Sequence, residues 1–194
     1  GISMNKTFLM ASVVFLFGCA ELPNFLVDLP LIGGKLGDFR QLGDAEWDLE
    51  DGVISSVRGE ANGYIYTKEI YTDFDMTLEV FIEAATNSGI YVRCSPEAIN
   101  PNQCYEFNIW DEHEIPANKT GSIVGIAPPS AEVSTIGKWS TMRIRLEDDH
   151  LQFWVNGTNT NDLRDDKFAS GVIALQYGGA NGMVRFRNIQ INKL

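Results

Sequence analysis

Two short segments of the sequence gather aromatic, charged and amide side chains at alternate positions. They read GIYVRC (89–94) and YEFNIWD (105–111), and in each of them apolar residues alternate with polar or aromatic ones. Successive side chains of an extended strand point to opposite faces, so the polar and aromatic residues would share one face. That face would carry Tyr91, Arg93, Glu106, Asn108 and Trp110, with Phe81 from a neighbouring strand.

Such a set of side chains suits the recognition of a saccharide. Aromatic rings pack against the apolar side of a sugar ring, whereas arginine, carboxylate and amide groups form planar, paired hydrogen bonds with hydroxyls. A plainer arrangement fits the alternation equally well: Arg93 and Glu106 would form an exposed cross-strand ion pair, with the aromatic residues packed under a loop. The two strands alone leave both interpretations open.

A histidine follows these strands directly and lies among carboxylates. His113 has Asp111, Glu112 and Glu114 as close neighbours in the sequence. A histidine in such surroundings can be a metal ligand or a general acid or base, although most loop histidines are neither. The sequence does not identify a metal ligand set, and a divalent metal ion is the candidate cofactor.

The elements that must position these residues are strands. FDMTLEVFIE (74–83) and MRIRLE (142–147) alternate with a period of two, which is typical of half-buried strands. In MVRFRNIQI (183–191) the parity shifts and predicts a β-bulge near Asn188. Because no long segment after the N-terminal region has a helical period, we predict an all-β fold, an antiparallel β-sandwich.

Composition narrows the class of partner. The chain has 194 residues and a formal net charge of -11, and 44% of its residues are hydrophobic. This length and composition are typical of one globular domain. The negative charge argues against a nucleic-acid partner, which would require a basic surface to neutralise phosphates. It also argues against direct attraction to an anionic membrane.

The N-terminal region has the pattern of an export signal. The apolar run FLMASVVFLFG (8–18) follows Lys6 and ends at Cys19. It is too short to span a bilayer, which takes about 20 residues, and it matches the short hydrophobic core of a signal peptide. Leu16-Phe17-Gly18-Cys19 resembles a bacterial lipobox, in which the cysteine is lipidated. The alternative is a hydrophobic strand or core helix with a buried free cysteine.

The chain therefore divides into three expected parts. Residues 1–18 would be a lipoprotein-type signal peptide, residues 19–37 a tether, and residues 38–194 the folded domain. The expected location is the bacterial cell envelope, periplasmic or at the cell surface, with membrane contact only through the lipid on Cys19.

Two further cysteines belong to the folded part. Cys94 and Cys104 lie at the end of one strand pattern and the start of the next. In an exported protein such a pair is more often bonded than free, so we predict a disulfide. Two unpaired buried thiols are the alternative.

Several sequence blocks, taken in order, resemble a known family. They are YIYTKEIYTDFDMTLEV (64–80), NSGIYVR (87–93), YEFNIWD (105–111), TGSIVGIAPP (120–129), GVIALQ (171–176) and VRFRNIQINKL (184–194). Together they resemble the 3-keto-disaccharide hydrolase domain family over residues 38–194. The resemblance implies a concanavalin A-like jelly-roll sandwich and an exported protein that acts on carbohydrate, as hydrolase or lyase of glycosides oxidised at C3 of the sugar.

The resemblance also implies a mechanism and roles for particular residues. A ketone at C3 acidifies the proton at C2, so that a base removes it, the substituent at C1 leaves, and water then adds back. By motif position, Arg93 would hold the enolate or a hydroxyl, Glu106 would be the base or a metal ligand, and Asp111 and His113 would be ligands or proton shuttles. The expected substrate-binding residues, on the concave sheet face, are Tyr91, Asn108, Trp110, Gln176 and Tyr177.

A second class of function is left open. Family members commonly carry a histidine soon after the Leu-Gln pair, where this chain has Tyr177. The alternative to an enzyme is a noncatalytic carbohydrate-binding or surface adhesion module, with Tyr91, Trp110 and Tyr177 as its platform. A structural envelope lipoprotein is the third possibility.

Overall fold

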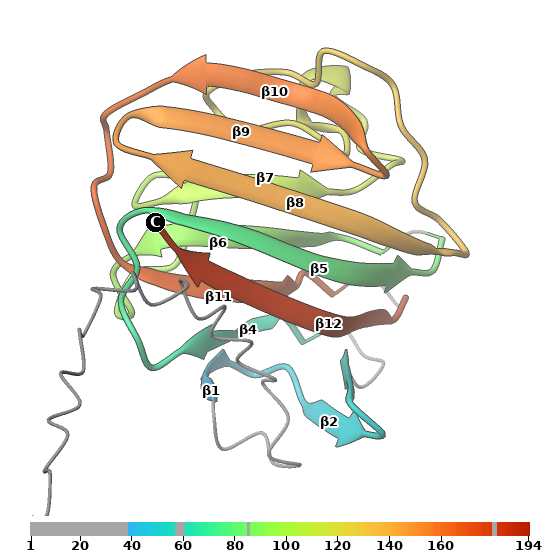
Figure 1. The fold of residues 1–194 in the computed structure, drawn as a ribbon. Coiled ribbons are helices and arrows are strands. Elements are labelled where there is room, and N and C mark those ends of the chain that lie inside the picture. Colours follow the sequence, from blue (N-terminus) through green and yellow to red (C-terminus); the bar gives the residue numbers. More distant parts are fainter. Residues whose placement is uncertain (1–38, 57–60, 85, 180–181) are drawn as a thin grey trace, which may run out of the picture.

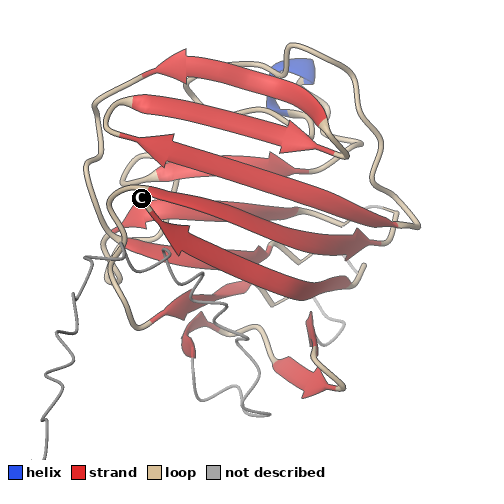
Figure 2. Cartoon of the chain, viewed as in Figure 1, coloured by secondary structure: helices blue, strands red, loops and turns tan. Residues whose placement is uncertain are grey.

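Two antiparallel β-sheets packed face to face form the domain in the computed structural model (Figure 1). The structure describes residues 39–56, 61–84, 86–179 and 182–194. Within these ranges the regular structure is almost entirely strand, apart from a 3-10 turn, η2 (Pro116–Asn118) (Figure 2). The prediction of an all-β sandwich is confirmed. The described residues contain no helix that is long and apolar enough to cross a membrane.

The strands divide unequally between the two sheets. The five-stranded sheet has the order β1 (Phe39–Gly43), β4 (Gly63–Thr67), β11 (Val172–Tyr177), β6 (Ser88–Cys94) and β7 (Tyr105–Ile109). The seven-stranded sheet has the order β10 (Thr158–Arg164), β9 (His150–Val155), β8 (Trp139–Glu147), β5 (Phe74–Ile82), β12 (Val184–Lys193), β3 (Val53–Ser56) and β2 (Trp47–Glu50). The expected signal peptide, the tether and Cys19 lie outside the described residues.

The core lies between the sheets and follows from the period-two alternation. Strand β5 buries every second residue from Phe74 to Ile82, as its pattern predicts. The sheets meet directly where the rings of Phe107 in β7 and Phe153 in β9 lie edge to face, with centroids 5.1 Å apart. Burying one side of each strand leaves the other side facing outward. The outer face of the five-stranded sheet is therefore where Tyr91 of β6 and Glu106 of β7 lie.

Two details of strand pairing bear on the sequence analysis. The predicted bulge in β12 is present, because the register against β5 shifts between Arg187 and Gln190 and Asn188 has φ 51°. Phe81, which we expected beside the residues of β6, instead belongs to β5 in the other sheet and packs against Trp139. Alternation alone could not assign neighbouring strand patterns to different sheets.

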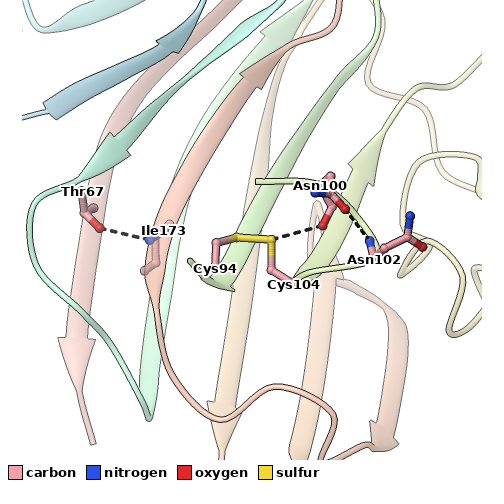
Figure 3. The surroundings of a disulfide bond; sticks show 6 residues. All are labelled: Thr67, Cys94, Asn100, Asn102, Cys104 and Ile173. Carbon is pink, nitrogen blue, oxygen red and sulfur yellow. Dashed lines mark hydrogen bonds between the residues drawn. A yellow bond between two sulfur atoms is a disulfide. The ribbon is translucent and has the colours of Figure 1, made fainter. Parts of the chain in front are cut away.

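A disulfide connects the end of β6 to the residue before β7. Figure 3 shows Cys94 and Cys104 joined through their sulfur atoms, with Cα atoms 4.7 Å apart. The bond closes the connection between the two strands that carry most of the expected site. In the same region the Ile173 N–H donates to the Thr67 hydroxyl at 3.0 Å, which ties β11 to the end of β4.

Removing the disulfide should lower the stability of the domain. For Cys94→Ala combined with Cys104→Ala we expect the free energy of unfolding to fall by about 3 kcal/mol, because the unfolded chain gains the entropy of an open loop of this length. Urea denaturation of the oxidised protein and the double variant would measure the difference. Equal midpoints and slopes for the two proteins would contradict the prediction.

Candidate functional site

Four neighbouring strands bring polar and aromatic side chains together on the outer face of the five-stranded sheet. In the register, Tyr91 of β6 lies opposite Glu106 of β7, and on the other side β11 pairs with β6 and β4. Gln176 of β11 lies opposite Tyr64 of β4. We call this set the outer-face site: Tyr64, Gly89, Tyr91, Glu106 and Gln176.

Glu106 is the carboxyl of the outer-face site, and its pKa is shifted toward neutrality. Glu106 belongs to strand β7, all of whose residues are buried, and it is itself only 7% exposed. Burial disfavours the charged form and raises the pKa of Glu106 to about 7, although a hydrogen bond from Tyr91 lowers it in part. A carboxyl with a pKa near neutrality can take up and release a proton at physiological pH.

The two tyrosines extend a hydrogen-bonded chain from this carboxyl. Tyr91 is hydrogen-bonded to Glu106 and to Tyr64, and Tyr64 is also hydrogen-bonded to Gln176. The rings of Tyr64 and Tyr91 lie edge to face with centroids 5.2 Å apart. Burial raises the pKa of both phenols, so both stay protonated and can donate hydrogen bonds at neutral pH.

The structure places Arg93 elsewhere, which corrects the expectation that it shares the face of Glu106. Its guanidinium donates to the carbonyls of Thr72 and Phe168 and pairs with the Asp73 carboxylate at 3.1 Å. Arg93 has φ 55°, and the register of β6 against β11 shifts at this point. This irregularity interrupts the alternation and turns the buried side chain away from the Glu106 face.

Asp111 is also engaged in structural hydrogen bonds. Its carboxylate accepts from the hydroxyls of Thr120 and Thr135 at 2.6 and 2.7 Å, and from the backbone N–H groups of Thr135 and Ile136. Burial by itself raises the pKa of Asp111, but these hydrogen bonds outweigh it and hold the pKa below its usual range. The charged carboxylate ties together distant parts of the long connection between β7 and β8.

His113 and Trp110 form a separate pair at the end of β7. Their rings pack edge to face with centroids 4.4 Å apart, and Trp110 stays half-buried. The His113 Nδ1 accepts a hydrogen bond from the Ile115 N–H at 3.0 Å. In the neutral ring this contact leaves the proton on Nε2.

Asn108 has a positioning role that the alternation could not show. It is buried, and its amide group donates to the Asn118 carbonyl, while its carbonyl oxygen accepts from the Ile109 N–H. Backbone bonds from Asn108 to Gly121 and Ser122 continue the contact. Asn108 therefore holds the 118–122 segment against the edge of β7.

Tyr177 is not part of the outer face, which corrects its expected role in binding substrate. It is fully buried in the core between the sheets, and its hydroxyl donates to the Gly182 carbonyl at 2.9 Å. It has the same parity as Ile173 and Leu175, which also point into the core. Gln176, one residue earlier, points outward.

Two members of the outer-face site were missed by sequence reasoning. Tyr64 belongs to GYIYT, in which Ile65 enters the core and the tyrosines on either side face outward. Gly89 lies beneath Glu106, Gln176 and Tyr91. The alternation around Ile65 was a usable signal for Tyr64, whereas the proximity of β4 to β11 and β6 is a property of the sheet order.

The described residues hold no cluster of three or more His, Cys, Asp or Glu side chains arranged to bind a metal ion. A pocket of about 320 Å³ does lie beside Asp111, lined also by Lys119, Pro129 and Glu132. It is formed by loops and does not include Glu106. The side chains of the outer-face site supply one carboxyl, two phenols and one amide.

Comparison with known proteins identifies the family of this β-sandwich. Residues 28–192 match the 3-keto-alpha-glucoside-1,2-lyase-like domain, so the chain belongs to this family. The expected family is thereby confirmed. The chain has no significant match among curated protein sequences.

Solved structures agree with this assignment. A "Putative glycosyl hydrolase" from Parabacteroides distasonis ATCC 8503 is 27% identical with a TM-score of 0.67, over 76% of this chain and 90% of that one. A second from the same organism is 22% identical with a TM-score of 0.64, over 76% and 83%. The carbohydrate binding module CBM66 from Bacillus subtilis shares the fold at 15% identity, with a TM-score of 0.62 over 79% and 95%.

The raised pKa of Glu106 should make stability fall as pH rises. The unfolded carboxyl ionises near pH 4.5 and the folded one only near 7, so stability is highest below about 4.5 and is lost between these values. For Glu106→Gln we expect a protein about 3 kcal/mol more stable than the wild type above pH 7, with the difference vanishing near pH 4.5.

Urea denaturation at several pH values would measure this effect. The matched control is Glu79→Gln, because Glu79 lies on the other sheet and its ion pair with Arg187 holds the pKa of that carboxyl below its usual range. The stability of the control relative to the wild type should not change as pH rises from 5 to 8, because both proteins keep Glu106 and Glu79 is ionised throughout this range. A constant difference between wild type and Glu106→Gln across this range would show that the folded pKa is not raised.

Proposed function

We propose that the chain is an exported domain that cleaves 3-keto-glycosides, with the sugar bound at the outer-face site. The observation that carries the proposal is Glu106, a nearly buried carboxyl whose pKa of about 7 suits it to exchange a proton with substrate. Membership of the 3-keto-alpha-glucoside-1,2-lyase-like family supports this class of substrate. The fold shared with a carbohydrate binding module agrees with a sugar ligand.

The first step would be an elimination that Glu106 begins as a base. Its carboxylate takes the proton from C2 of the sugar, which the neighbouring C3 ketone makes acidic. The electron pair of that C–H bond forms a C1–C2 double bond, and the bond from C1 to the leaving oxygen breaks. Release of the product at this stage would make the protein a lyase.

The hydrogen-bonded tyrosines offer a route for the proton that the leaving oxygen needs. Tyr64 is half-buried and is the member of the chain that reaches furthest toward solvent. Its hydroxyl would protonate the leaving oxygen, and the proton held by Glu106 would replace it through Tyr91. Addition of water to C1, with return of a proton to C2, would complete a hydrolysis.

Export forms part of the proposal and rests on the N-terminal sequence. The apolar run 8–18 followed by Cys19 has the pattern of a lipoprotein signal. The disulfide between Cys94 and Cys104 is of the kind that persists in an oxidising compartment. We propose a lipid-anchored location in the bacterial cell envelope.

Changing the proposed base should abolish turnover without abolishing binding. For Glu106→Gln we expect kcat to fall about 10²- to 10⁴-fold, the usual contribution of a general base. In the wild type, kcat/KM should fall about tenfold for each pH unit below about 7, because only the ionised carboxyl accepts the proton. NMR time courses with a 3-keto-glucoside would measure both effects.

The control for this experiment is Glu79→Gln, which should turn over substrate like the wild type. The series would be repeated with manganese, calcium and EDTA to determine whether a divalent ion takes part. Full activity of Glu106→Gln would refute the assignment of the base. Absence of turnover by the wild type under all these conditions would refute the proposal that the protein is an enzyme that cleaves 3-keto-glycosides.

A noncatalytic carbohydrate-binding module is the second candidate, and two observations favour it. Arg93 and Asp111, both expected to be catalytic, are occupied by structural contacts. Trp110 is half-buried at the end of β7, where an aromatic ring can serve as a platform for a sugar.

For such a module, Trp110→Ala should weaken saccharide binding by about 1 to 3 kcal/mol, because the ring loses its apolar contact with the sugar. NMR titration with the unoxidised glycoside would measure the affinity. Trp154→Ala is the control, since Trp154 lies on the other sheet beneath Arg143 and should not affect binding. Unchanged affinity in Trp110→Ala would exclude this ring as the platform.

A further inference from the structure

The outer-face site is closed to a ligand in this conformation. Tyr91 is 2% exposed, Glu106 and Gln176 are buried beside it, and all three side chains pack closely over Gly89. A group that accepts a proton from a substrate must come within hydrogen-bond reach of it. The proposed function therefore requires an element that covers this face to move away.

A single buried side chain attaches one covering element to the sheet. Residues 95–103, between the two disulfide cysteines, are called the disulfide loop, and Ile99 is the only buried residue among them, at 5% exposed. Ile99 belongs to the same apolar cluster as Tyr66, Ala174 and Tyr91 on the outer face. The disulfide loop thus lies over this face with one apolar anchor.

The hydrogen bonds of the disulfide loop hold it together rather than to the sheet. The Ala98 N–H donates to the Ser95 carbonyl at 3.0 Å. The N–H groups of Asn102 and Cys104 donate to Asn100, the first to its side chain and the second to its carbonyl (Figure 3). Among the described residues, the loop's backbone-to-backbone hydrogen bonds all stay within it or go to Cys104. A segment with so few contacts to the rest of the fold can open locally without global unfolding.

The surface that Ile99 covers has the chemistry to hold a sugar ring. Across the strands, Tyr66 of β4 lies opposite Ala174 of β11, which pairs with Tyr91 of β6, and Tyr91 lies opposite Glu106 of β7. We call Tyr66, Ala174 and Tyr91 the tyrosine floor. Aromatic side chains pack against the apolar side of a sugar, and the proposed base lies next to this floor.

We propose that the disulfide loop is a lid, and that the sugar binds on the tyrosine floor after Ile99 has withdrawn from it. In the closed state Ile99 takes the place of the sugar ring and keeps water from Tyr91. In the open state the floor is free, with Glu106 at its edge. The inference rests on the proposed function and adds to it the surface that holds the sugar and the contact that regulates access.

Such a lid lowers the affinity for sugar in a way that a merely structural residue does not. Only the open fraction of the molecules binds, so the apparent Kd is the intrinsic Kd divided by that fraction. Weakening the contact of Ile99 raises the open fraction and should therefore tighten binding. Truncating a residue that only supports the fold would weaken binding or leave it unchanged.

Ile99→Ala and Ile99→Asp test the lid in the absence of substrate. Photo-CIDNP NMR detects tyrosine rings that a dissolved flavin dye can reach. We expect Tyr66 and Tyr91 to gain signal in both variants, and more in Ile99→Asp, because a carboxylate is unfavourable in an apolar cluster. The control is Ile70→Ala, since Ile70 is 61% exposed between β4 and β5 and should leave Tyr91 protected.

Kinetics with a 3-keto-glucoside test the tyrosine floor. Ile99→Ala should lower KM about threefold or more with kcat unchanged, and Ile70→Ala should behave as the wild type. Tyr66→Leu should raise KM about tenfold, because the aromatic ring is lost from the floor. Tyr66→Phe keeps the ring and should retain the KM of the wild type.

The outcomes separate this inference from the proposed function. Turnover by the wild type, with Tyr91 equally protected and KM unchanged in both Ile99 variants, would overturn the lid and leave the enzyme standing. A Tyr91 ring that becomes accessible in Ile99→Asp, without binding or turnover of the sugar by any of the proteins, would overturn the floor and the proposed function together. If Ile99→Asp does not fold, as denaturation would show, the tyrosine signals and KM of Ile99→Ala decide the matter.

Discussion

The structure depends on one constraint: each strand must bury one side against the opposite sheet, because neither sheet alone can remove its apolar side chains from water. The contact between Phe107 and Phe153 shows the two sheets meeting in this shared core. Once alternate residues of β6, β7 and β11 enter the core, the residues between them must face outward together. The outer-face site is thus a direct consequence of the packing that holds the domain together.

That outward face is itself largely covered, and this covering gives Glu106 its unusual acidity. Tyr91 packs beside it, Tyr64 packs on Tyr91, and Ile99 from the connection that the disulfide closes joins the same apolar cluster. Removing water from a carboxyl favours its neutral form. A fold that is stable enough to keep this group buried can therefore hold a proton acceptor whose pKa lies near neutrality.

The charged residues that do not belong to the site have a different part in the molecule. Arg93 and Asp111 lie near the two ends of the β6 and β7 pair, and each satisfies several hydrogen-bonding groups of neighbouring loops. A buried charge with this many partners is costly to disturb, because removing it leaves those partners unpaired. These two residues fix the ends of the strands, which leaves Glu106 as the proposed proton acceptor.

By itself the sequence determined strands β5 to β8 and β12, most of their buried faces, the bulge at Asn188 and the cysteine pair, because a period of two and its interruptions are local properties. It also brought Tyr91 and Glu106 to one face. Tyr177 shares the parity of Ile173 and Leu175, so alternation assigns it to the core, and only the analogy with a family histidine placed it at the site. The tertiary structure alone decided the rest: the irregular backbone that turns Arg93 away, the sheet order that brings Tyr64 beside Tyr91, and the close packing of side chains from β6, β7 and β11 over Gly89. These features arise from contacts between residues distant in the chain, which no local pattern encodes.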